Sequence, residues 1–262
     1  MFDLSIVLPT CNRASLLEKC LASIWSNVAC RYELIVVDGA SGDGTQRVLA
    51  DAGQSLGERL TVITEPAREG FVRAANKGFR VARGRYLTWL NDDAYPLPGA
   101  FDRAIEQFER ETGGAAADSL LALFHRWSRP RNIAYETQQR GRAYRLCHVR
   151  GTLYANFALG RRELFEKLGY FDERYYVCAA DPDLSLKAWE AGHRVEPAWG
   201  CIIDHDEHVD DRRAADTGRG QEDNAALFAK WDLPAVNPLR NDFSPMNPCT
   251  LHGLRPEHAL AA

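Results

Sequence analysis

The sequence predicts an α/β fold in which a mostly parallel sheet carries helices on both faces. Short apolar runs alternate with segments of helical periodicity over the first 110 residues. Such an alternation needs crossover connections, which are typical of parallel sheets covered on both sides. Polar residues follow several of the apolar runs directly, and ligands of such sheets bind beyond the carboxyl ends of the strands. The 262 residues, 45% of them hydrophobic, suffice for one large core.

In the first half, each element follows from its local pattern. Apolar runs predict strands at residues 4–8, 33–37, 60–64 and 85–90. Apolar residues at helical spacing predict helices at residues 14–25, from Thr45 onward, 70–83 and 97–111. The order strand, helix, strand repeats three times, which indicates a nucleotide-binding half over residues 1–111.

The second half is less regular. Strands are expected at residues 119–124 and 200–204, and helices at 160–169 and 183–191. Residues 128–150 are rich in arginine and have no clear period, so we interpret them as a long flexible excursion. We expect one domain over residues 1–232, with residues 112–232 as its acceptor and catalytic half. The proline-rich residues 233–262 are expected to wrap the surface or to be disordered.

Composition excludes several classes of protein. The formal net charge of -4 argues against a nucleic-acid partner, which usually requires a basic excess. No apolar stretch approaches the roughly 20 residues of a membrane-spanning helix, and no signal peptide is apparent at Asp3 and the residues after it. The seven cysteines show no CxxC spacing, which indicates reduced thiols in a cytoplasmic protein and no zinc site.

The stretch RYLTWLNDDAYP places two carboxylates, Asp92 and Asp93, where a buried strand ends. Adjacent like charges are costly there unless a cation lies close by. One interpretation is a turn, since Asn and Asp favour turns and Pro96 follows. The other is a site for Mg²⁺ or Mn²⁺, which a carboxylate or two and the oxygens of a substrate diphosphate commonly hold.

The stretch GASGDGT follows the second predicted strand and resembles a phosphate-binding loop only superficially. It fits neither GxGxxG nor the Walker pattern with its lysine. We interpret it as a turn, with Asp43 or Thr45 capping the next helix. Asp38 precedes this turn, and an acid that ends a buried strand could accept hydrogen bonds from a ribose or a base.

Two later stretches contain candidate catalytic and metal-binding side chains. Asp181 and Asp183 lie at the start of a predicted helix, where capping explains one acid better than two, so Asp181 is a candidate general base. His205 follows an apolar strand directly and is a candidate metal ligand in the same crevice. His208 is interpreted as part of a solvated acidic loop.

Four motifs occur in one order along the chain. They are LSIVLPTCNRASLLEKCLASI, YELIVVDGASGDGT, EGFVRAANKGFRVARGRYLTWLNDDA and LFEKLGYFDERYYVCAADPDLSLKAWEAGHRV. Together they resemble the family-2 nucleotide-sugar glycosyltransferases, which have the GT-A fold, over about residues 4–110 and 150–206. The resemblance implies a Rossmann-like mostly parallel sheet with a variable acceptor-side region. It also implies an enzyme that transfers a sugar from a nucleoside-diphosphate sugar, with Mn²⁺ or Mg²⁺, in polysaccharide or glycoconjugate biosynthesis.

The resemblance assigns residues to the donor site. Residues matching Pro9, Thr10 and Arg13 line the base pocket of that family, and the acid matching Asp38 contacts the nucleoside. Asn76, in the helix expected at 70–83, is included among the donor-binding residues.

The resemblance also implies roles for the acids. The family's DxD signature matches residues 91–93, so Asp93 is expected to bind the metal and Asp92 to contact ribose or sugar. Asp181 matches the catalytic base of the family's Glu-Asp pair, and His205 matches the late histidine. The implied mechanism is an inverting single displacement. The sequence departs from the family at Asn91, Glu69, Ala75 and Ala180, the last standing where the pair has its Glu.

Other functions stay open. A sugar nucleotidyltransferase would have a glycine-rich loop after the first strand, where this chain has PTCNRAS. A non-catalytic nucleotide-sugar binding protein is consistent with Ala180. The acceptor could be a saccharide, a lipid-linked molecule or a small molecule. The basic residues 125–145 could meet a phosphate-bearing acceptor or a membrane surface, which leaves a peripheral membrane location open, or could form a solvated loop.

Overall fold

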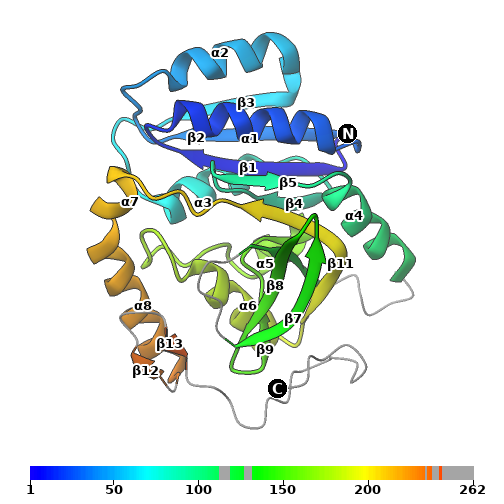
Figure 1. Ribbon diagram of the computed structural model, residues 1–262, viewed down its shortest axis with the longest axis vertical. Helices are drawn as coiled ribbons and strands as arrows, with labels where there is room; N and C mark the ends of the chain where they lie inside the picture. Colours follow the sequence, from blue (N-terminus) through cyan, green and yellow to red (C-terminus); the bar gives the residue numbers. More distant parts are fainter. Residues whose placement is uncertain (112–118, 127–131, 234, 238–241, 244–262) are drawn as a thin grey trace.

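The computed structural model describes residues 1–111, 119–126, 132–233, 235–237 and 242–243. In this part of the chain, an 11-stranded sheet follows the order β3-β2-β1-β4-β10-β6-β11-β5, with β7, β8 and β9 added beside β6 (Figure 1). Its strands are β1 (Leu4–Thr10), β2 (Tyr32–Asp38), β3 (Leu60–Thr64), β4 (Tyr86–Trp89), β5 (Ala94–Pro96), β6 (Ser119–His125), β7 (Ile133–Gln139), β8 (Arg142–Val149), β9 (Thr152–Tyr154), β10 (Ala158–Arg161) and β11 (Arg194–His205). The helices are α1 (Ala14–Asn27), α2 (Thr45–Leu56), α3 (Phe71–Val81), α4 (Ala100–Glu111), α5 (Arg162–Lys167), α6 (Ala180–Glu190), α7 (Asp211–Ala215) and α8 (Thr217–Trp231), with a 3₁₀ turn at Gly57–Arg59.

The first half has the expected parallel arrangement. β1 pairs in parallel with both β2 and β4, and β2 pairs in parallel with β3. Strands β1, β2 and β3 advance in one direction along the sheet, whereas the step from β3 to β4 returns across β2 and β1. Right-handed crossovers therefore place α1 and α2 on one face and α3 on the other. Thr10 is level with Asp38 in the register, so the carboxyl ends of β1 and β2 meet at one edge.

Close packing behind this edge fixes the end of β4. A Cβ at Gly78 of α3 would lie 2.4 Å from Val7 Cγ1, so only glycine allows this approach of helix to sheet. Trp89, the last residue of β4, packs edge-on against Phe171 with ring centroids 5.0 Å apart and against Phe79 at 6.2 Å. Such pairs stabilise beyond the area they bury. This packing therefore fixes the position of the residues that follow Trp89.

The second half closes the sheet with antiparallel strands. β10 runs antiparallel to β4 and β6, whereas β11 runs parallel to β6 and antiparallel to the short β5. His205, at the end of β11, is level with Ala94 of β5 in the register. Since β5 begins directly after the acid pair, this pairing brings His205 beside Asp92 and Asp93.

The excursion expected at residues 128–150 is wrong for its described part, which forms the hairpin of β7 and β8 (Figure 1). Glu136 lies directly opposite Arg145, and their side chains are joined by a 2.7 Å ion pair. This cross-strand pair adds to the buried side chains of Tyr135, Tyr144 and Leu146, which join the hairpin to the hydrophobic core.

The tail expected at residues 233–262 lies almost entirely outside the described residues. Its described part contains two short strands that pair antiparallel, β12 (Ala235–Asn237) and β13 (Asp242–Phe243). The described helices include none with the length and apolar character needed to cross a membrane.

Candidate active site

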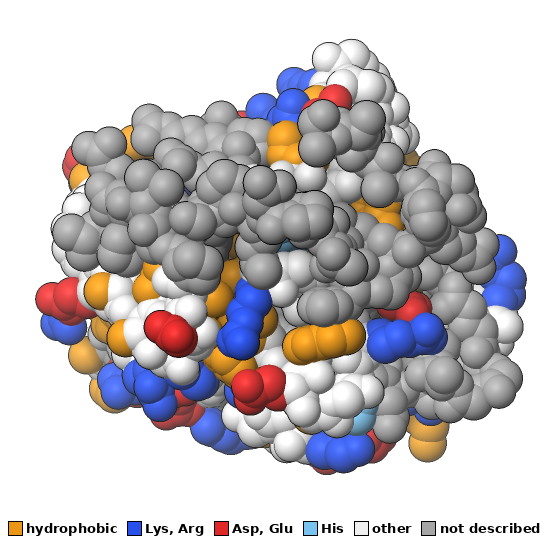
Figure 2. Space-filling view, turned by 90° about the horizontal axis from the view of Figure 1, so that it is seen from below, with side chains coloured by type: hydrophobic (Ala, Val, Ile, Leu, Met, Phe, Trp, Pro, Cys, Tyr) orange, Lys and Arg blue, Asp and Glu red, His pale blue; other side chains and the backbone are white. Residues whose placement is uncertain are grey.

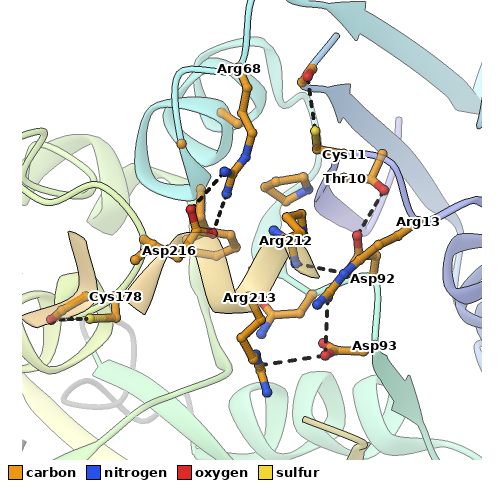
Figure 3. A pocket seen from close by; sticks show the side chains of 18 of the residues that line it. Thr10, Cys11, Arg13, Arg68, Asp92, Asp93, Cys178, Arg212, Arg213 and Asp216 are labelled. Carbon is orange, nitrogen blue, oxygen red and sulfur yellow. Dashed lines mark hydrogen bonds and ion pairs between the residues drawn. The ribbon is translucent and has the colours of Figure 1, made fainter. Parts of the chain in front are cut away.

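A cavity of about 390 Å³ opens at the carboxyl ends of β1 and β4 (Figure 3). Side chains from both halves of the chain line it. Among the expected site residues, it is lined by Pro9, Thr10, Arg13, Asp92, Asp93 and Asp181. The structure thus brings together six residues that lie up to 172 positions apart in the sequence.

The two carboxylates after β4 are held in different ways. Asp92 accepts hydrogen bonds from Thr10 Oγ1 at 3.0 Å and from Arg13 Nη1 at 2.9 Å. Burial raises the pKa of Asp92, although Arg13 and Arg212 act in the opposite direction. Burial has the same effect on Asp93, but His205 and the nearby arginines outweigh it and hold the pKa of Asp93 well below its usual range. The adjacent acids are thereby separated in pKa, with Asp93 the more acidic.

Arg13 links this acid pair to a segment almost 200 residues away. It lies just before α1, is buried, and reaches Asp93 Oδ2 at 3.4 Å in addition to Asp92. Its Nε donates to Asp210 Oδ2 at 2.6 Å. The pKa of Arg13 is raised because these carboxylates outweigh the cost of burial. The guanidinium of Arg13 therefore supplies a positive charge next to the two acids, which offsets part of their mutual repulsion.

His205 and Asp93 nevertheless fit a divalent cation. Asp93 Oδ1 is buried and accepts no hydrogen bond from the described residues, and it faces His205 Nε2 at 3.3 Å. The same Nε2 lies 3.3 Å from Asn91 Nδ2. If Nε2 carried a proton, it could donate to Asp93 but would meet the N–H donors of the Asn91 amide. A cation between the imidazole and the carboxylate would instead be bound by both His205 and Asp93.

The protein side chains alone are too few to complete the coordination shell of a metal ion. Within the described residues, no group of three or more His, Cys, Asp or Glu side chains is arranged to hold a metal ion. Asp93 and His205 would thus supply two ligands, with substrate oxygens completing the shell. His208 is exposed and contributes its backbone N–H, which donates to Asp93 Oδ2 at 3.0 Å.

Asp181 lines another part of the same cavity, in the first turn of α6. Tyr154 Oη donates a hydrogen bond to Asp181 Oδ2 across 3.4 Å. Burial raises the pKa of Asp181 to about 7, against the lowering effect of nearby hydrogen bonds. Ala179, which precedes the helix, has a positive φ of 67°, and such local strain is often found at functional sites. This carboxyl group can both take and release a proton near neutral pH.

Asp183 is unsuited to that role. It is fully buried and binds Trp231 Nε1 and Lys230 Nζ, each at 2.7 Å, together with Tyr175 Oη at 3.1 Å. These contacts fasten α6 to α8. Asp183 is therefore not an alternative to Asp181 in the cavity.

Two expected donor-binding residues do not line the cavity. Asp38 is fully buried, and its carboxylate accepts hydrogen bonds from Ser41 N and the Gln46 side chain. Its neighbour Gly39 reaches the cavity instead, so Asp38 supports the turn that forms one wall. The turn predicted at residues 39–45 is confirmed: Asp43 accepts hydrogen bonds from Thr45 at the start of α2.

Asn76 is the second expected donor-binding residue that does not line the cavity. Its Nδ2 donates to Phe171 O at 2.9 Å, and its Oδ1 accepts from Phe171 N at 3.0 Å. Both amide atoms thus fasten α3 to the chain before α6. The structure gives Asn76 a structural task and does not place it in the donor site.

Sequence reasoning missed several cavity residues that come from outside the matched motifs. They are Arg68, Tyr154, Arg212, Arg213 and Asp216. Arg68 and Asp216 form a double hydrogen bond at 2.8 and 2.6 Å (Figure 3). For Arg212 and Arg213, the signal available in the sequence was the arginine pair in DDRRAAD, which directly follows the acidic loop.

The basic stretch at residues 125–145 offers little free charge in its described part. Arg126 and Arg142 bind Asp204 at 3.0 and 2.7 Å, and Arg145 binds Glu136. Figure 2, which shows the molecule from below, has basic and acidic side chains interspersed among the described residues. Ion pairing therefore accounts for these three arginines.

The chain is similar in sequence to known glycosyltransferases. Residues 5–169 match the model of "Glycosyl transferase family 2". A "PGL/p-HBAD biosynthesis glycosyltransferase" of Mycobacterium tuberculosis is 38% identical over 189 residues, which cover 71% of this chain and 69% of the relative. "Glycosyltransferase AglE" of Haloferax volcanii is 26% identical over 130 residues, 44% of this chain and 42% of the relative.

Solved structures share the architecture. A mannosyltransferase from Pyrobaculum calidifontis, in complex with GDP-Man and Mn²⁺, has a TM-score of 0.64 at 23% identity and covers 92% of this chain and 68% of its own. TarS residues 1–349 of S. aureus, in complex with UDP-GlcNAc, has a TM-score of 0.62 at 17% identity and covers 86% and 66%. These likenesses confirm the GT-A fold. The chain belongs to glycosyl transferase family 2 and is a glycosyltransferase.

Proposed function

We propose that this glycosyltransferase moves a sugar from a nucleoside-diphosphate sugar to an acceptor nucleophile, with inversion and with a divalent cation bound. The observation that carries the proposal is a single cavity that holds an acid pair at the end of β4 and a separate carboxyl group, Asp181, with a raised pKa. The acid pair suits a diphosphate bound through a metal ion, and Asp181 suits the removal of a proton from the acceptor.

Asp93 and His205 would hold Mn²⁺ or Mg²⁺. When bound, the cation supplies positive charge against the departing diphosphate. The solved mannosyltransferase in complex with GDP-Man and Mn²⁺ supports a metal of this kind. Asp92, held by Thr10 and Arg13, is left to position ribose or sugar hydroxyls.

Asp181 acts as the base in this proposal. Its ionised carboxylate takes the proton of the acceptor nucleophile, which forms a bond to the anomeric carbon. The bond from that carbon to the diphosphate oxygen breaks with its electron pair on the oxygen. Tyr154 restrains the carboxylate through its hydrogen bond. General-base assistance of this type is typically worth about 10²–10⁴-fold in rate.

The donor and the acceptor are matters for experiment. Relatives named for PGL/p-HBAD biosynthesis support a role in glycoconjugate synthesis for this chain as well. The test is incubation with UDP- and GDP-sugars, with Mn²⁺ or with EDTA. We expect slow release of UDP or GDP that EDTA abolishes, and a released sugar whose first-formed anomer, seen by NMR, is inverted. Metal-dependent binding without any turnover, even with acceptors supplied, would favour a non-catalytic binding protein.

A further inference from the structure

The segment that follows β11 is fixed over the acid pair by several contacts. Asp206 N donates to Asp93 O at 2.8 Å. Arg13 Nη2 donates to His208 O at 3.3 Å, and Asp210 accepts hydrogen bonds from Arg13 as well as from Arg213 N, at 2.8 Å. Because the acid pair and Arg13 hold both ends of this segment, the first residues of α7 face the cavity.

Two arginines of α7 point toward the acid pair but lie too far from it for hydrogen bonds. Arg212 Nη2 lies 3.9 Å from Asp92 Oδ1, and Arg213 Nη2 lies 3.7 Å from Asp93 Oδ2 (Figure 3). Both distances exceed that of a hydrogen bond. Arg212 is the more buried, with 24% of its side chain exposed, and its Nε is a buried donor without a hydrogen-bond partner in the described part of the chain. A buried guanidinium left in this state is costly.

Of the four described arginines that line the cavity, Arg13 and Arg68 have close ion pairs. Arg13 has Asp92 and Asp210, and Arg68 has both oxygens of Asp216. The carboxylates nearest Arg212 already bind Arg13. Burial lowers the pKa of Arg212, and the charges of Arg13 and Arg68 add to this effect. A divalent cation at Asp93 would add positive charge close to Arg212 and Arg213, and a multiply charged anion in the cavity would offset that charge and accept a hydrogen bond from the buried Nε of Arg212.

We propose that Arg212, with Arg213 beside it, binds the diphosphate of the donor and of the released nucleotide. The inference rests on the proposed function and adds the residues that receive the leaving group. A guanidinium presents a planar fork of donors that suits phosphate oxygens. As the anomeric carbon–oxygen bond breaks, the electron pair stays on the diphosphate oxygen, and the Arg212 fork donates hydrogen bonds to that diphosphate.

The test compares Arg212→Gln with Arg212→Lys and with the control Arg219→Gln. Arg219 lies on α8, is 62% exposed and stacks over Tyr176 outside the cavity lining. Calorimetry with Mn²⁺ would measure binding of UDP, GDP, uridine, guanosine and inorganic pyrophosphate. We expect Arg212→Gln to weaken the preferred nucleoside diphosphate and pyrophosphate by about 10–100-fold. The nucleoside should bind unchanged, and Arg212→Lys should lie in between.

A second readout separates ligand binding from a structural role. Because burial, together with the charges of Arg13 and Arg68, outweighs the attraction of nearby carboxylates for Arg212, Arg212→Gln without ligand should melt at the same temperature as the parent or higher. A lower Tm together with equal loss of nucleoside and diphosphate would mean that Arg212 merely supports the fold. Diphosphate affinity equal to that of the parent would overturn the inference and leave the proposed function intact. A parent protein that binds neither UDP nor GDP with Mn²⁺ would overturn both.

Discussion

Replacing Asp181 by Asn should lower turnover by about 10²-fold or more and stabilise the protein at the same time. Burial raises the pKa of Asp181 to about 7 from the ordinary 3.8. Between these two values the folded protein keeps the proton and the unfolded chain does not. Stability therefore falls as the pH rises through this window, because ionisation stabilises the unfolded chain while the buried carboxyl group of the folded protein stays protonated.

The size of the effect follows from the shift. Each pKa unit corresponds to about 1.4 kcal/mol, so ionising Asp181 costs the folded state about 4 kcal/mol above pH 7. Asn has nearly the same shape and cannot ionise. The gain in free energy of unfolding of Asp181→Asn over the parent should therefore grow by about 2–3 kcal/mol from pH 5 to pH 7. For a chain of this length, that corresponds to a difference in Tm of about 5–10 °C.

The assay is thermal unfolding at several pH values in EDTA, so that no cation is bound. Asp183→Asn is the matched control two residues away. It removes a fully buried partner of Lys230 and should lower Tm at every pH. A stability gain for Asp181→Asn that does not change with pH would refute the burial argument.

The kinetic part of this prediction concerns the base. In the parent, the ionised fraction of Asp181 should rise from about 10% at pH 6 to about 90% at pH 8, with a roughly ninefold rise in kcat/KM. Asp181→Asn should bind donor normally and lose about 10²-fold or more in turnover. Normal turnover with a bound acceptor would assign the base elsewhere.

Three further predictions concern the donor site. Asp93→Asn should weaken Mn²⁺-dependent nucleotide binding about tenfold or more, since it removes the ionised ligand, and unchanged affinity in calorimetry would remove Asp93 from the metal site. His205→Ala should lower Mn²⁺ affinity in calorimetry, while His208→Ala should not; equal behaviour of the two variants would contradict the ligand assignment. Asp38→Ala should weaken nucleotide binding at any Mn²⁺ concentration, because the turn at Gly39 loses its anchor, and a nucleotide titration with unchanged affinity would show that the anchor is dispensable.

The sequence predicted the first half well because its signals are local. Apolar runs that end in Thr10, Asp38 and the acid pair mark strand ends, and parallel strands bring such ends together. The family resemblance located Asp181 and His205, and the pairing of β5 with β11 explains why His205 lies beside Asp93.

Other parts depend on contacts that local patterns do not record. The ion pair of Arg13 with Asp210 joins residues 197 positions apart, and that of Arg68 with Asp216 joins residues 148 apart. Asn76 is a polar helical residue that could equally face a ligand, and only the fold reveals that the Phe171 backbone takes both its amide atoms. The β7–β8 hairpin was missed because its buried apolar residues, among them Tyr135, Tyr144 and Leu146, are interspersed with charged residues and show no clear period in the sequence.

Three of the four departures from the family pattern have a common structural consequence. Ala75 and Ala180 are fully buried within the core, and Glu69 binds Lys77 at 2.6 Å, so none of the three offers a free polar group to a sugar. The cavity still needs hydrogen-bonding groups for sugar hydroxyls, because a buried hydroxyl without a partner is costly. Asn156 and Asn224 line the cavity from the second half of the chain. Recognition of the sugar would then involve the region after β9, which sequence reasoning had reserved for the acceptor, together with Asp92 of the first half.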